Sequence, residues 1–397
     1  MLRFELNINK IKLNCKNRQK VDDNFIIDYA RSINYFGSIV ISDSSSIDLL
    51  KGVCSVAECY LMMDTPNLES IKLGLQMGVR KFIVPDREIE KINKMVSKNI
   101  IIARITLKEK SVLNNDITDF KEELSDICSN LKPYCSEILI DWDDKIKIDQ
   151  NTIFTIADSI SGFIKFPLTL LDPNGQNSKE LENKGINPFI RSSNVFSEEE
   201  MIKIFNSIPD FQKNDGLIPT IVQDDHDQIL MLAYSSQDSL TQALKQKQGI
   251  YFSRSRKSIW IKGETSGNYQ ELYQVRYDCD QDTLLFTVHQ LGFACHLERY
   301  SCFEDKKFGF LDLYEIIEDR IKNPVPNSYS SKISKDEKLI IEKIREETNE
   351  LVNYVDQENL VWEIADLSYF ILVLMAKKGI KIQDILNELW KRRNYGN

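Results

Sequence analysis

Thiols, carboxylates and an imidazole gather between residues 278 and 302 of this chain. In chain order, these side chains are Asp278, Cys279, Asp280, Asp282, Cys295, His296 and Cys302. Thiolates favour zinc, whereas carboxylates favour magnesium or calcium. Three protein ligands leave the fourth tetrahedral position of zinc open for water, which is the pattern of a catalytic rather than a structural zinc site. The spacing therefore predicts a catalytic zinc at the three cysteines, where His296 carries protons.

Other interpretations of these residues compete with the zinc site. Cysteine is often only a small buried hydrophobic residue. Alternating aspartates also occur in calcium-binding loops, but such a loop needs Gly at its sixth position and Glu at its twelfth. Those positions hold Thr283 and His289, which excludes a calcium loop. A solvated acidic turn stays open as an alternative for the three aspartates alone.

Hydroxyl, cationic and glycine residues lie just upstream in a pattern suited to phosphate. Guanidinium groups bind phosphate oxygens in a bidentate manner, and exposed backbone N–H groups add further donors. The segment therefore predicts a cradle for a phosphate and its sugar. The candidate substrate-binding residues are Ser253, Arg254, Arg256, Trp260, Lys262, Gly263, Glu264, Ser266 and Gly267.

Residues 214–303 resemble phosphoribosyl-AMP cyclohydrolase of histidine biosynthesis. The resemblance rests on the motifs S-R-S-R, W-x-K-G-E-T-S-G, D-C-D-x-D and G-x-A-C-H-x5-C-F. It implies that the three cysteines are zinc ligands, that the three aspartates bind magnesium and that His296 is the general base. It also implies a homodimer in which Cys279 of one chain completes a zinc site with Cys295 and Cys302 of the other.

The implied reaction is the hydrolytic opening of an adenine ring alkylated on N1. Alkylation makes C6 an electrophilic carbon, zinc-bound hydroxide adds to it, and His296 moves the protons that let the N1–C6 bond break. Zinc deaminases follow a similar logic. Magnesium at the aspartates would hold the substrate phosphate. Leu297 and Glu298 stand where that family usually has Thr-Gly, a departure that leaves the metal ligands intact and affects local substrate contacts.

Two further pairs of acids lie near the C-terminus with helical spacing. Glu347 and Glu350 form one i, i+3 pair, and Glu363 and Asp366 form the other. That spacing puts both carboxylates of a pair on one face of an α-helix. Apolar residues recur at helical spacing around both pairs, so two antiparallel helices would aim four carboxylates at one point. Converging carboxylates call for a cation such as magnesium, although a solvated charged face is the alternative.

Residues 309–393 resemble phosphoribosyl-ATP pyrophosphohydrolase, an all-helical relative of nucleotide pyrophosphatases with E-x-x-E and E-x-x-D motifs. The resemblance implies that the four acids bind magnesium, which activates a water molecule for attack on the triphosphate. It also implies that Ser328, Lys343 and Arg392 contact phosphates. The acidic motif alone would also fit a housekeeping enzyme for damaged nucleotides. Its neighbour favours the pathway enzyme, because the product phosphoribosyl-AMP is the substrate of the cyclohydrolase.

The first 200 residues alternate short β-rich runs with helical stretches. The predicted strands are 38–42, 60–63, 81–84, 100–105, 137–140 and 162–166. Such alternation is typical of a parallel sheet or a (β/α) barrel, whose active site lies where Asp43, Asp64 and Asp141 fall, at the strand C-terminal ends. The segment resembles the non-catalytic N-terminal region of the fungal multidomain histidine-biosynthesis protein. A scaffold or interaction role is therefore favoured over a degenerate or working barrel enzyme.

Composition limits the classes of function. The 397 residues suffice for two or three domains, and 42% hydrophobic with 28% charged residues is ordinary for a globular protein. A net charge of −9 argues against broad binding to nucleic acid or anionic membranes. The apolar run 369–376 is too short to span a bilayer, which takes about 20 residues. Eight cysteines form no dense disulfide framework, which favours a cytoplasmic protein with reduced thiols.

We therefore expect a multidomain homodimer. Residues 1–200 would form an α/β domain of open role, with a degenerate β/α barrel as one form of it. Residues 201–304 would form an α+β cyclohydrolase domain, and residues 305–397 an all-α pyrophosphohydrolase domain. The expected function is hydrolysis of phosphoribosyl-ATP to phosphoribosyl-AMP and pyrophosphate, followed by opening of the adenine ring, with Zn²⁺ and Mg²⁺ as cofactors.

A rival from another class is a zinc-stabilised interaction protein with a non-catalytic helical bundle. Its zinc would need a fourth protein ligand, and His289 or His296 would be the histidines in reach. The sequence leaves open whether the intermediate is channelled between the two sites. It also leaves open whether the chain is part of a longer polypeptide that carries a histidinol dehydrogenase domain.

Overall fold

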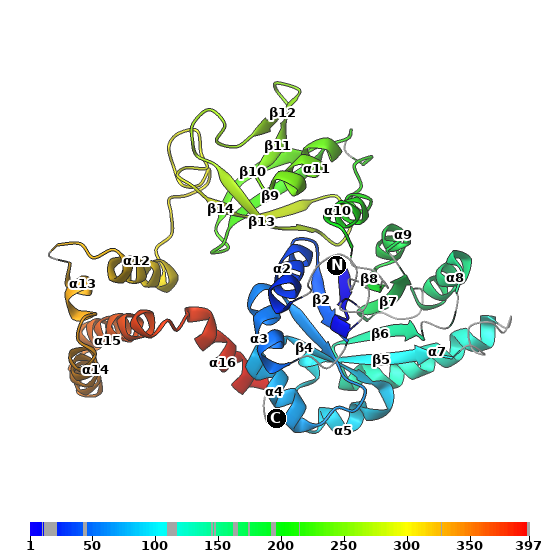
Figure 1. Cartoon of the computed structure of the whole chain (residues 1–397), viewed down its shortest axis with the longest axis horizontal. Helices are drawn as coiled ribbons and strands as arrows, with labels where there is room; N and C mark the ends of the chain where they lie inside the picture. The colour runs from blue at the N-terminus through cyan, green and yellow to red at the C-terminus, as the bar shows by residue number, and fades with distance from the viewer. Residues whose placement is uncertain are drawn as a thin grey trace. The chain divides into compact units, whose positions relative to one another are not determined.

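The computed structural model describes the chain as two compact units (Figure 1). The described residues are 1–9, 11, 22–42, 46–108, 117–143, 146, 148–161, 166–173, 175–191, 196–213, 215–326 and 328–394. The first unit comprises Met1–Asp305 and Lys391–Asn397, and the second spans Lys306–Trp390. The expected start of the C-terminal domain at residue 305 lies next to this division.

Residues up to 191 form a closed barrel of eight parallel strands, which confirms the expected α/β class. The strands are β1 (Arg3–Leu6), β2 (Ser38–Ile41), β3 (Cys59–Met62), β4 (Lys81–Pro85), β5 (Ile101–Leu107), β6 (Glu137–Trp142), β7 (Leu168–Pro173) and β8 (Ile186–Arg191). β1 pairs in parallel with both β2 and β8, which closes the sheet. All residues of β2 and β6 are buried, as expected where helices cover the outside of a parallel sheet.

Five of the six predicted strands coincide with β2 to β6. The sixth, 162–166, is wrong where it can be compared, because Phe166 lies in a bend and β7 begins at Leu168. Pro167 has no N–H group to donate to a strand ladder, so the strand starts after it. Residues 162–165 and Asp43 lie outside the described residues.

Helices connect the strands and surround the barrel (Figure 1). They are α2 (Asp23–Asn34), α3 (Ile47–Val56), α4 (Leu68–Met77), α5 (Ile89–Asn93), α7 (Ile117–Leu131), α8 (Gln150–Ser161) and α9 (Ser178–Asn183). α4 begins with a reciprocal cap between Asn67 and Ser70 and ends at Gly78. Gly78 has a φ of 100°, a left-handed conformation that glycine adopts without steric cost.

A buried polar network occupies the N-terminal end of the barrel interior. Arg3 Nη2 donates to Glu137 Oε2 at 2.7 Å, and both residues also bond to Thr169. Lys81 Nζ lies 3.9 Å from Glu137 Oε2. Burial by itself would raise the pKa of Glu137, but Arg3, Thr169 and Lys81 together outweigh burial and the net shift is downward. Breaking such a buried pair would leave a charge without compensation.

The middle part of the chain is a small α+β domain that begins with α10 (Glu198–Asn206). Ser197 caps this helix as predicted, and the expected domain limit at residue 200 falls inside it. The main sheet has the order β10-β9-β14-β13, with β14 parallel to β9, and a two-stranded sheet joins β11 and β12. The elements are β9 (Ile218–Asp224), β10 (Ile229–Ser235), α11 (Gln237–Gln246), β11 (Ile250–Ser253), β12 (Ser258–Ile261), β13 (Gln270–Tyr277) and β14 (Leu284–Gln290).

The second unit contains only helices among its described residues. They are α12 (Phe310–Lys322), α13 (Tyr329–Ile333), α14 (Glu337–Val352), α15 (Gln357–Lys378) and α16 (Ile382–Asn394). α14 packs along α15, as the paired acid motifs predict. Buried side chains such as Ile317, Ile340 and Val373 form the core of this unit.

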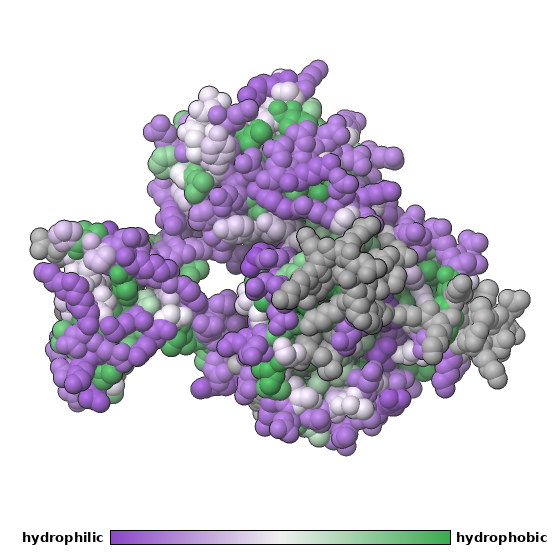
Figure 2. Space-filling view, viewed as in Figure 1, coloured by the Kyte–Doolittle hydropathy of each residue, from purple (hydrophilic) through white to green (hydrophobic). Residues whose placement is uncertain are grey.

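α15 is the one helix in the described part of the chain that is long and apolar enough to cross a membrane by length and composition. The apolar run 369–376 therefore belongs to a longer apolar helix. Phe370, Val373 and Met375 of this helix are buried in the core of the unit. The space-filling view of the whole chain shows hydrophilic residues over most of the visible face, with apolar residues scattered among them (Figure 2).

Candidate functional site

The middle domain contains a cavity of about 640 Å³, here called the thiol cavity. Its lining brings together residues of β10, β11, β12 and the segment after β14. The lining residues are Met231, Leu232, Ala233, Tyr234, Phe252, Ser253, Arg254, Arg256, Trp260, Lys262, Ser266, Asn268, Ala294, Cys295, His296, Glu298 and Cys302. The structure thus brings six of the nine predicted substrate-binding residues to the same cavity as two of the predicted zinc ligands and His296.

Cys295 and Cys302 lie together in this cavity. Backbone bonds fold the chain back between them, because the Cys295 N–H donates to the Arg299 carbonyl at 3.1 Å and the Cys302 N–H donates to the Leu230 carbonyl at 2.7 Å. Burial and the neighbouring Cys295 thiol raise the pKa of Cys302. Two thiols that share one cavity suit a soft cation that binds both as thiolates.

Lys262 is a cation that interacts electrostatically with both thiols of this pair. Burial lowers its pKa, and the thiols of Cys302 and Cys295 oppose that shift. Its Nζ donates to the Phe293 carbonyl at 2.9 Å, which holds the ammonium at the cavity wall. A fixed cation at this place favours thiolates and anionic substrate groups alike.

The two arginines of the predicted cradle are held against aromatic rings. The Arg254 guanidinium carbon lies 3.7 Å from the centre of the Tyr234 ring, and the Arg256 carbon lies 5.9 Å from that of Trp260. Ser253 Oγ accepts from the Arg256 backbone N–H at 3.2 Å, which shapes the turn after β11. Stacking leaves the guanidinium edges available for phosphate oxygens.

Sequence reasoning missed Tyr234 and Asn268 as lining residues and named Glu298 only as a departure that affects substrate contacts. Asn268 follows the W-x-K-G-E-T-S-G motif directly, so its position in the sequence was a usable signal. Tyr234 lies on β10, and the sequence gives no sign that this strand borders the cradle. Glu298 has a φ of 58°, which is a left-handed backbone conformation. The departure from Thr-Gly therefore places a carboxylate at the cavity, on a residue position that favours glycine.

Gly263, Glu264 and Gly267, which were predicted to bind substrate, are absent from the described lining of the thiol cavity. Gly263 has a φ of 92°, and a Cβ atom there would lie 2.5 Å from the Tyr269 nitrogen. Gly267 has a φ of 76°. The two glycines therefore shape the turn that carries Lys262 and Ser266 to the cavity, and their role as direct ligands stays a prediction.

The predicted magnesium ligands form a separate group, here called the aspartate loop (residues 278–282). The carboxylate oxygens of Asp278, Asp280 and Asp282 lie within 4.8 Å of one another. Asp278 Oδ1 also accepts from the Asp282 N–H at 3.1 Å, and Lys213 Nζ lies 3.5 Å from Asp282 Oδ2. Three carboxylates around one point, largely open to solvent, fit a hard and partly hydrated cation such as Mg²⁺.

Cys279 belongs to the aspartate loop and does not line the thiol cavity. Its side chain is exposed, whereas Cys295 is only 8% exposed. No group of three ligands in the described part of one chain unites the three predicted zinc thiols. The structure therefore brings two of the three together, which is the arrangement expected if the third comes from a second chain.

The two histidines considered as a fourth zinc ligand differ in their surroundings. His289 Nδ1 lies 3.1 Å from Asp225 Oδ2, and its ring stacks on Tyr273 with centroids 6.2 Å apart. His296 is exposed and lines the thiol cavity. His289 is thus engaged by other residues, and His296 is placed where a proton carrier would act.

The four acids predicted in the helical unit form a carboxylate cluster (Glu347, Glu350, Glu363 and Asp366). Oxygens of Glu347, Glu363 and Asp366 lie within 4.8 Å of one another, and Glu347 and Glu363 are buried. Burial and the neighbouring acids, Glu350 first, raise the pKa of Glu347. Desolvation and Glu363 raise the pKa of Glu350. Carboxylates that gather around one point fit a divalent cation, which would favour their charged forms.

The three residues predicted to contact phosphate in the helical unit lie on different elements and do not form one described cluster. Lys343 Nζ lies 2.7 Å from Glu346 Oε2 and 3.9 Å from Glu347 Oε1, so it stands beside the carboxylate cluster. Ser328 caps α13 by accepting from the Ser331 N–H at 3.3 Å. Arg392 lies on α16. Phosphate binding by Ser328, Lys343 and Arg392 stays a prediction.

Comparisons with known proteins agree with this division of the sites. The family model for phosphoribosyl-AMP cyclohydrolase matches residues 231–304, and the one for phosphoribosyl-ATP pyrophosphohydrolase matches residues 310–393. The first match includes the thiol cavity and the aspartate loop. The second includes the whole carboxylate cluster.

Two kinds of relatives are similar to the chain. The histidine biosynthesis bifunctional protein HisIE of Pyrococcus furiosus is 37% identical over 209 residues, 49% of this chain and 99% of the relative. That of Bacillus subtilis is 39% identical over 194 residues, 45% of this chain and 93% of the relative. The histidine biosynthesis trifunctional protein of Kluyveromyces lactis is 32% identical over 302 residues, 72% of this chain and 37% of the relative.

The trifunctional relatives are much longer than the matched region, since the match spans 37% of the Kluyveromyces lactis protein and 22% of the Saccharomyces cerevisiae protein. A match over 72% of this chain also exceeds the half that residues 201–397 occupy. The similarity to the Kluyveromyces lactis protein therefore extends into the barrel region.

Proposed function

The chain belongs to the family of the histidine biosynthesis bifunctional proteins, and we propose that it catalyses two consecutive steps of that pathway. The helical unit hydrolyses phosphoribosyl-ATP to phosphoribosyl-AMP and pyrophosphate. The middle domain then opens the adenine ring of phosphoribosyl-AMP by hydrolysis of the N1–C6 bond. The observation that carries this proposal is that each family match contains its own cluster of ligand-type side chains.

In the helical unit, the carboxylate cluster would hold Mg²⁺ and Lys343 would neutralise substrate phosphate. Bound magnesium supplies charge neutralisation for the triphosphate and an acidified water. Glu347 and Glu363 are buried, so their carboxylates are held in place before substrate arrives.

In the middle domain, Arg254 and Arg256 bind the phosphate and sugar of phosphoribosyl-AMP. Cys295, Cys302 and Cys279 would hold zinc, which would lower the pKa of a water molecule at the site toward about 7. The His296 imidazole takes a proton from the water that attacks C6 and returns one to N1 as the N1–C6 bond breaks. His296 is exposed next to Cys295 and lines the thiol cavity, which supports this role.

The proposed active form is a homodimer. Cys279 is separated from the other two thiols within one chain, so a second chain would have to supply it. Large apolar side chains next to the thiol pair support this, because Leu297 and Phe303 are 62% and 65% exposed. In the helical unit, Trp362 is 59% and Val361 58% exposed on α15. Contact with a second copy would bury such patches.

The membrane-compatible composition of α15 has an explanation in this proposal. One side of the helix is buried in its own unit, and its exposed apolar residues would face a second chain. We therefore propose a protein that works in the cytoplasm with small-molecule substrates and without nucleic acid or a membrane.

The proposal is tested by measuring zinc content together with ring-opening absorbance when phosphoribosyl-AMP is added to the purified chain. We expect about one zinc per chain and turnover that a chelator abolishes. Stoichiometric zinc without turnover would favour the rival zinc-stabilised interaction protein.

A further inference from the structure

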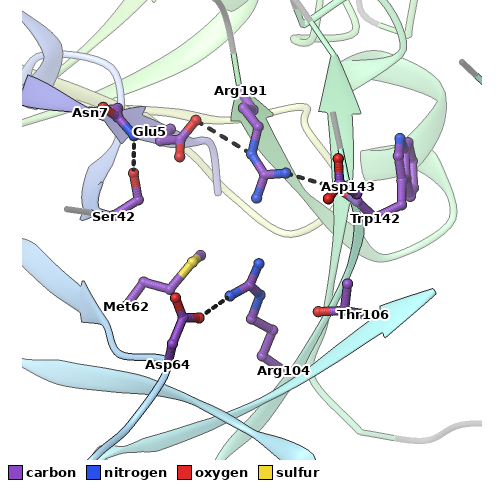
Figure 3. Close-up of a pocket in the computed structure, with 10 residues that line it drawn as sticks. All are labelled: Glu5, Asn7, Ser42, Met62, Asp64, Arg104, Thr106, Trp142, Asp143 and Arg191. Carbon is purple, nitrogen blue, oxygen red and sulfur yellow. Dashed lines mark hydrogen bonds and ion pairs between the residues drawn. The ribbon is translucent and has the colours of Figure 1, made fainter. Parts of the chain in front are cut away.

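The barrel contains a polar cavity of about 250 Å³ that neither hydrolase site uses (Figure 3). Its lining residues lie on five strands or within two residues after the end of a strand. They are Glu5, Asn7, Ser42, Met62, Asp64, Arg104, Thr106, Trp142, Asp143 and Arg191. Barrel interiors are normally filled by side chains, and catalytic or binding residues gather at the C-terminal ends of the strands. The cavity, here called the barrel mouth, is therefore placed where a ligand site is expected.

Asp141 fixes the two arginines of the barrel mouth side by side. Its carboxylate is fully buried, and Oδ2 accepts from Arg104 Nε at 2.9 Å and from Arg191 Nη2 at 2.8 Å. Thr106 Oγ1 donates to the other oxygen at 2.9 Å. Both oxygens of Asp141 thus accept hydrogen bonds from the protein, and the carboxylate fixes the positions of the two guanidinium groups.

Glu5 is a buried acid with one carboxylate oxygen that has no hydrogen bond in the described part of the chain. Its side chain is 5% exposed, and its Oε2 lies 3.3 Å from Arg191 Nε without making a hydrogen bond to any described residue. A buried carboxylate oxygen that lacks hydrogen bonds is costly. At the opposite end of the barrel, both Glu137 oxygens are hydrogen-bonded by Arg3. The barrel mouth is therefore the end of the barrel at which a buried carboxylate oxygen still lacks a hydrogen-bond donor.

We propose that the barrel mouth binds an uncharged, polyhydroxylated small molecule of about the size of a monosaccharide. Hydroxyl groups would donate to Glu5 and to Asp64, a carboxylate that is 81% exposed and already paired with Arg104 at 3.0 Å. Ligand oxygens would accept from the Arg104 guanidinium. The acids of the described lining outnumber its arginines, which disfavours a phosphate group next to Glu5. This site is separate from the two hydrolase activities.

The test is saturation-transfer NMR of D-ribose with the full chain, with inorganic phosphate as competitor. We expect a ribose signal that phosphate does not displace, and about tenfold weaker binding for Glu5→Gln and for Asp64→Asn. Asp64 is exposed, so its variant leaves folding intact even if that of Glu5 does not. Asp158→Asn, which removes an exposed ion pair with Lys184, is the matched control and should bind as the unchanged chain does.

Three results would overturn this proposal. They are the absence of a ribose signal, equal binding by the Asp64→Asn and Asp158→Asn variants, and displacement of ribose by phosphate, which would make the barrel mouth an anion site. Both variants should retain hydrolysis of phosphoribosyl-ATP, because the helical unit does not contain these residues.

A second set of contacts, at the opposite end of the barrel, reaches the strand that leads into the aspartate loop. On β13, Arg276 Nη1 donates to the Tyr35 carbonyl at 3.0 Å and Nη2 donates to the Asn34 carbonyl at 3.2 Å, at the end of α2. Tyr277 Oη donates to Glu182 Oε1 at 2.7 Å, on α9. These contacts join β13 to the ends of α2 and α9.

The loop itself is also held from the barrel side. With its amide oriented to satisfy both partners, Gln281 donates to the Ile208 carbonyl and to Asn183, each at 3.0 Å. Gln281 is 3% exposed and has a φ of 65°, so the middle of the loop is fixed in a left-handed conformation. The backbone N–H of Asp210 donates to the Gln281 carbonyl at 2.8 Å.

We infer that the barrel positions the aspartate loop, with Tyr277 and Gln281 as positioning residues. This inference rests on the proposed metal-binding role of the loop. It gives the barrel a task in ring opening, because three carboxylates must converge to bind one cation. Tyr277 and Gln281 touch neither substrate nor metal and act through the loop backbone.

Direct binding of Mn²⁺, followed by electron paramagnetic resonance, tests this inference without turnover. Tyr277→Phe removes only the hydroxyl that bonds to Glu182 and should weaken the Mn²⁺ affinity of the middle domain about tenfold. Tyr273→Phe, on the same strand and 44% exposed, is the matched control and should bind as before. Glu363→Gln in both backgrounds removes the signal of the helical unit.

Equal Mn²⁺ affinity of the Tyr277→Phe and Tyr273→Phe variants would overturn the positioning role. Mn²⁺ binding that follows the expected order in a chain without ring-opening activity would support positioning and refute the proposed function. The two failures are therefore distinguishable.

Discussion

Replacing Glu363 by Gln should stabilise the helical unit in the absence of metal while it abolishes magnesium-dependent hydrolysis. Oxygens of Glu347, Glu363 and Asp366 lie within 4.8 Å of one another. Two unit charges about 5 Å apart repel by about 3 kcal/mol at an effective dielectric constant of 20, and screening lowers this to about 1 kcal/mol. Glutamine keeps an oxygen that can accept from Asn359 Nδ2, as Glu363 does at 2.6 Å.

We therefore expect metal-free Glu363→Gln to be more stable than the unchanged chain by about 1 to 3 kcal/mol. Mg²⁺ at 1,000 times its Kd should reverse the order, because it stabilises the unchanged chain by about 4.1 kcal/mol. Amide hydrogen exchange of α14 and α15, with chelator and with Mg²⁺, measures this local stability in the full chain. Glu358→Gln, an exposed acid in the first turn of α15, is the matched control and should show no reversal.

A Glu363→Gln variant that is destabilised equally with and without Mg²⁺ would refute this reasoning. In that case Glu363 would serve as a structural hydrogen-bonding residue, and the carboxylate cluster would not be a cation site.

Three further expectations concern the middle domain and the barrel. Mixing Cys279→Ala chains with Cys295→Ala chains should restore about a quarter of the ring-opening rate. Half of the random dimers contain one chain of each kind, and one of the two sites in such a dimer is intact. No recovery of activity would contradict a zinc site shared between two chains. His296→Asn should lower kcat about 10²- to 10⁴-fold at unchanged zinc content, checked by steady-state kinetics and metal analysis. Glu137→Gln should lower the free energy of barrel unfolding by about 3 kcal/mol near pH 7, because Arg3 stays buried without its partner. Since the native pKa of Glu137 is below its unfolded value of about 4.3, its contribution is present above that pH and is lost as the pH falls through the native value. Urea unfolding measured from pH 3 to 7 should therefore show that the variant loses less free energy of unfolding at acid pH than the unchanged chain does.

Much of the site could be predicted because its chemistry is encoded in local motifs. Cys295, His296 and Cys302 lie in one segment, and a short backbone fold brings both thiols to the same cavity. The i, i+3 spacing of the acids in α14 and α15 is a helical property, so their convergence follows once the two helices pack. These assignments depend on few long-range contacts.

The remaining features depend on contacts between distant segments. Tyr234 reaches the thiol cavity only because β10 borders the turn after β11, which no local pattern announces. The contact of Tyr277 with Glu182 joins residues far apart in the sequence. The strand alternation predicted a parallel sheet or a barrel without deciding between them, and Glu5 is an ordinary acid in the sequence. Its burial in the barrel mouth appears only when the eight strands close.

The central claim, two consecutive hydrolyses by separate sites of one chain, is tested most directly by supplying phosphoribosyl-ATP to three forms of the protein and analysing the products. The unchanged chain should form the ring-opened product. Cys295→Ser should accumulate phosphoribosyl-AMP, and Glu363→Gln should leave phosphoribosyl-ATP intact while it still opens added phosphoribosyl-AMP. Loss of both steps in either variant, with the fold retained, would contradict the assignment of one step to each site.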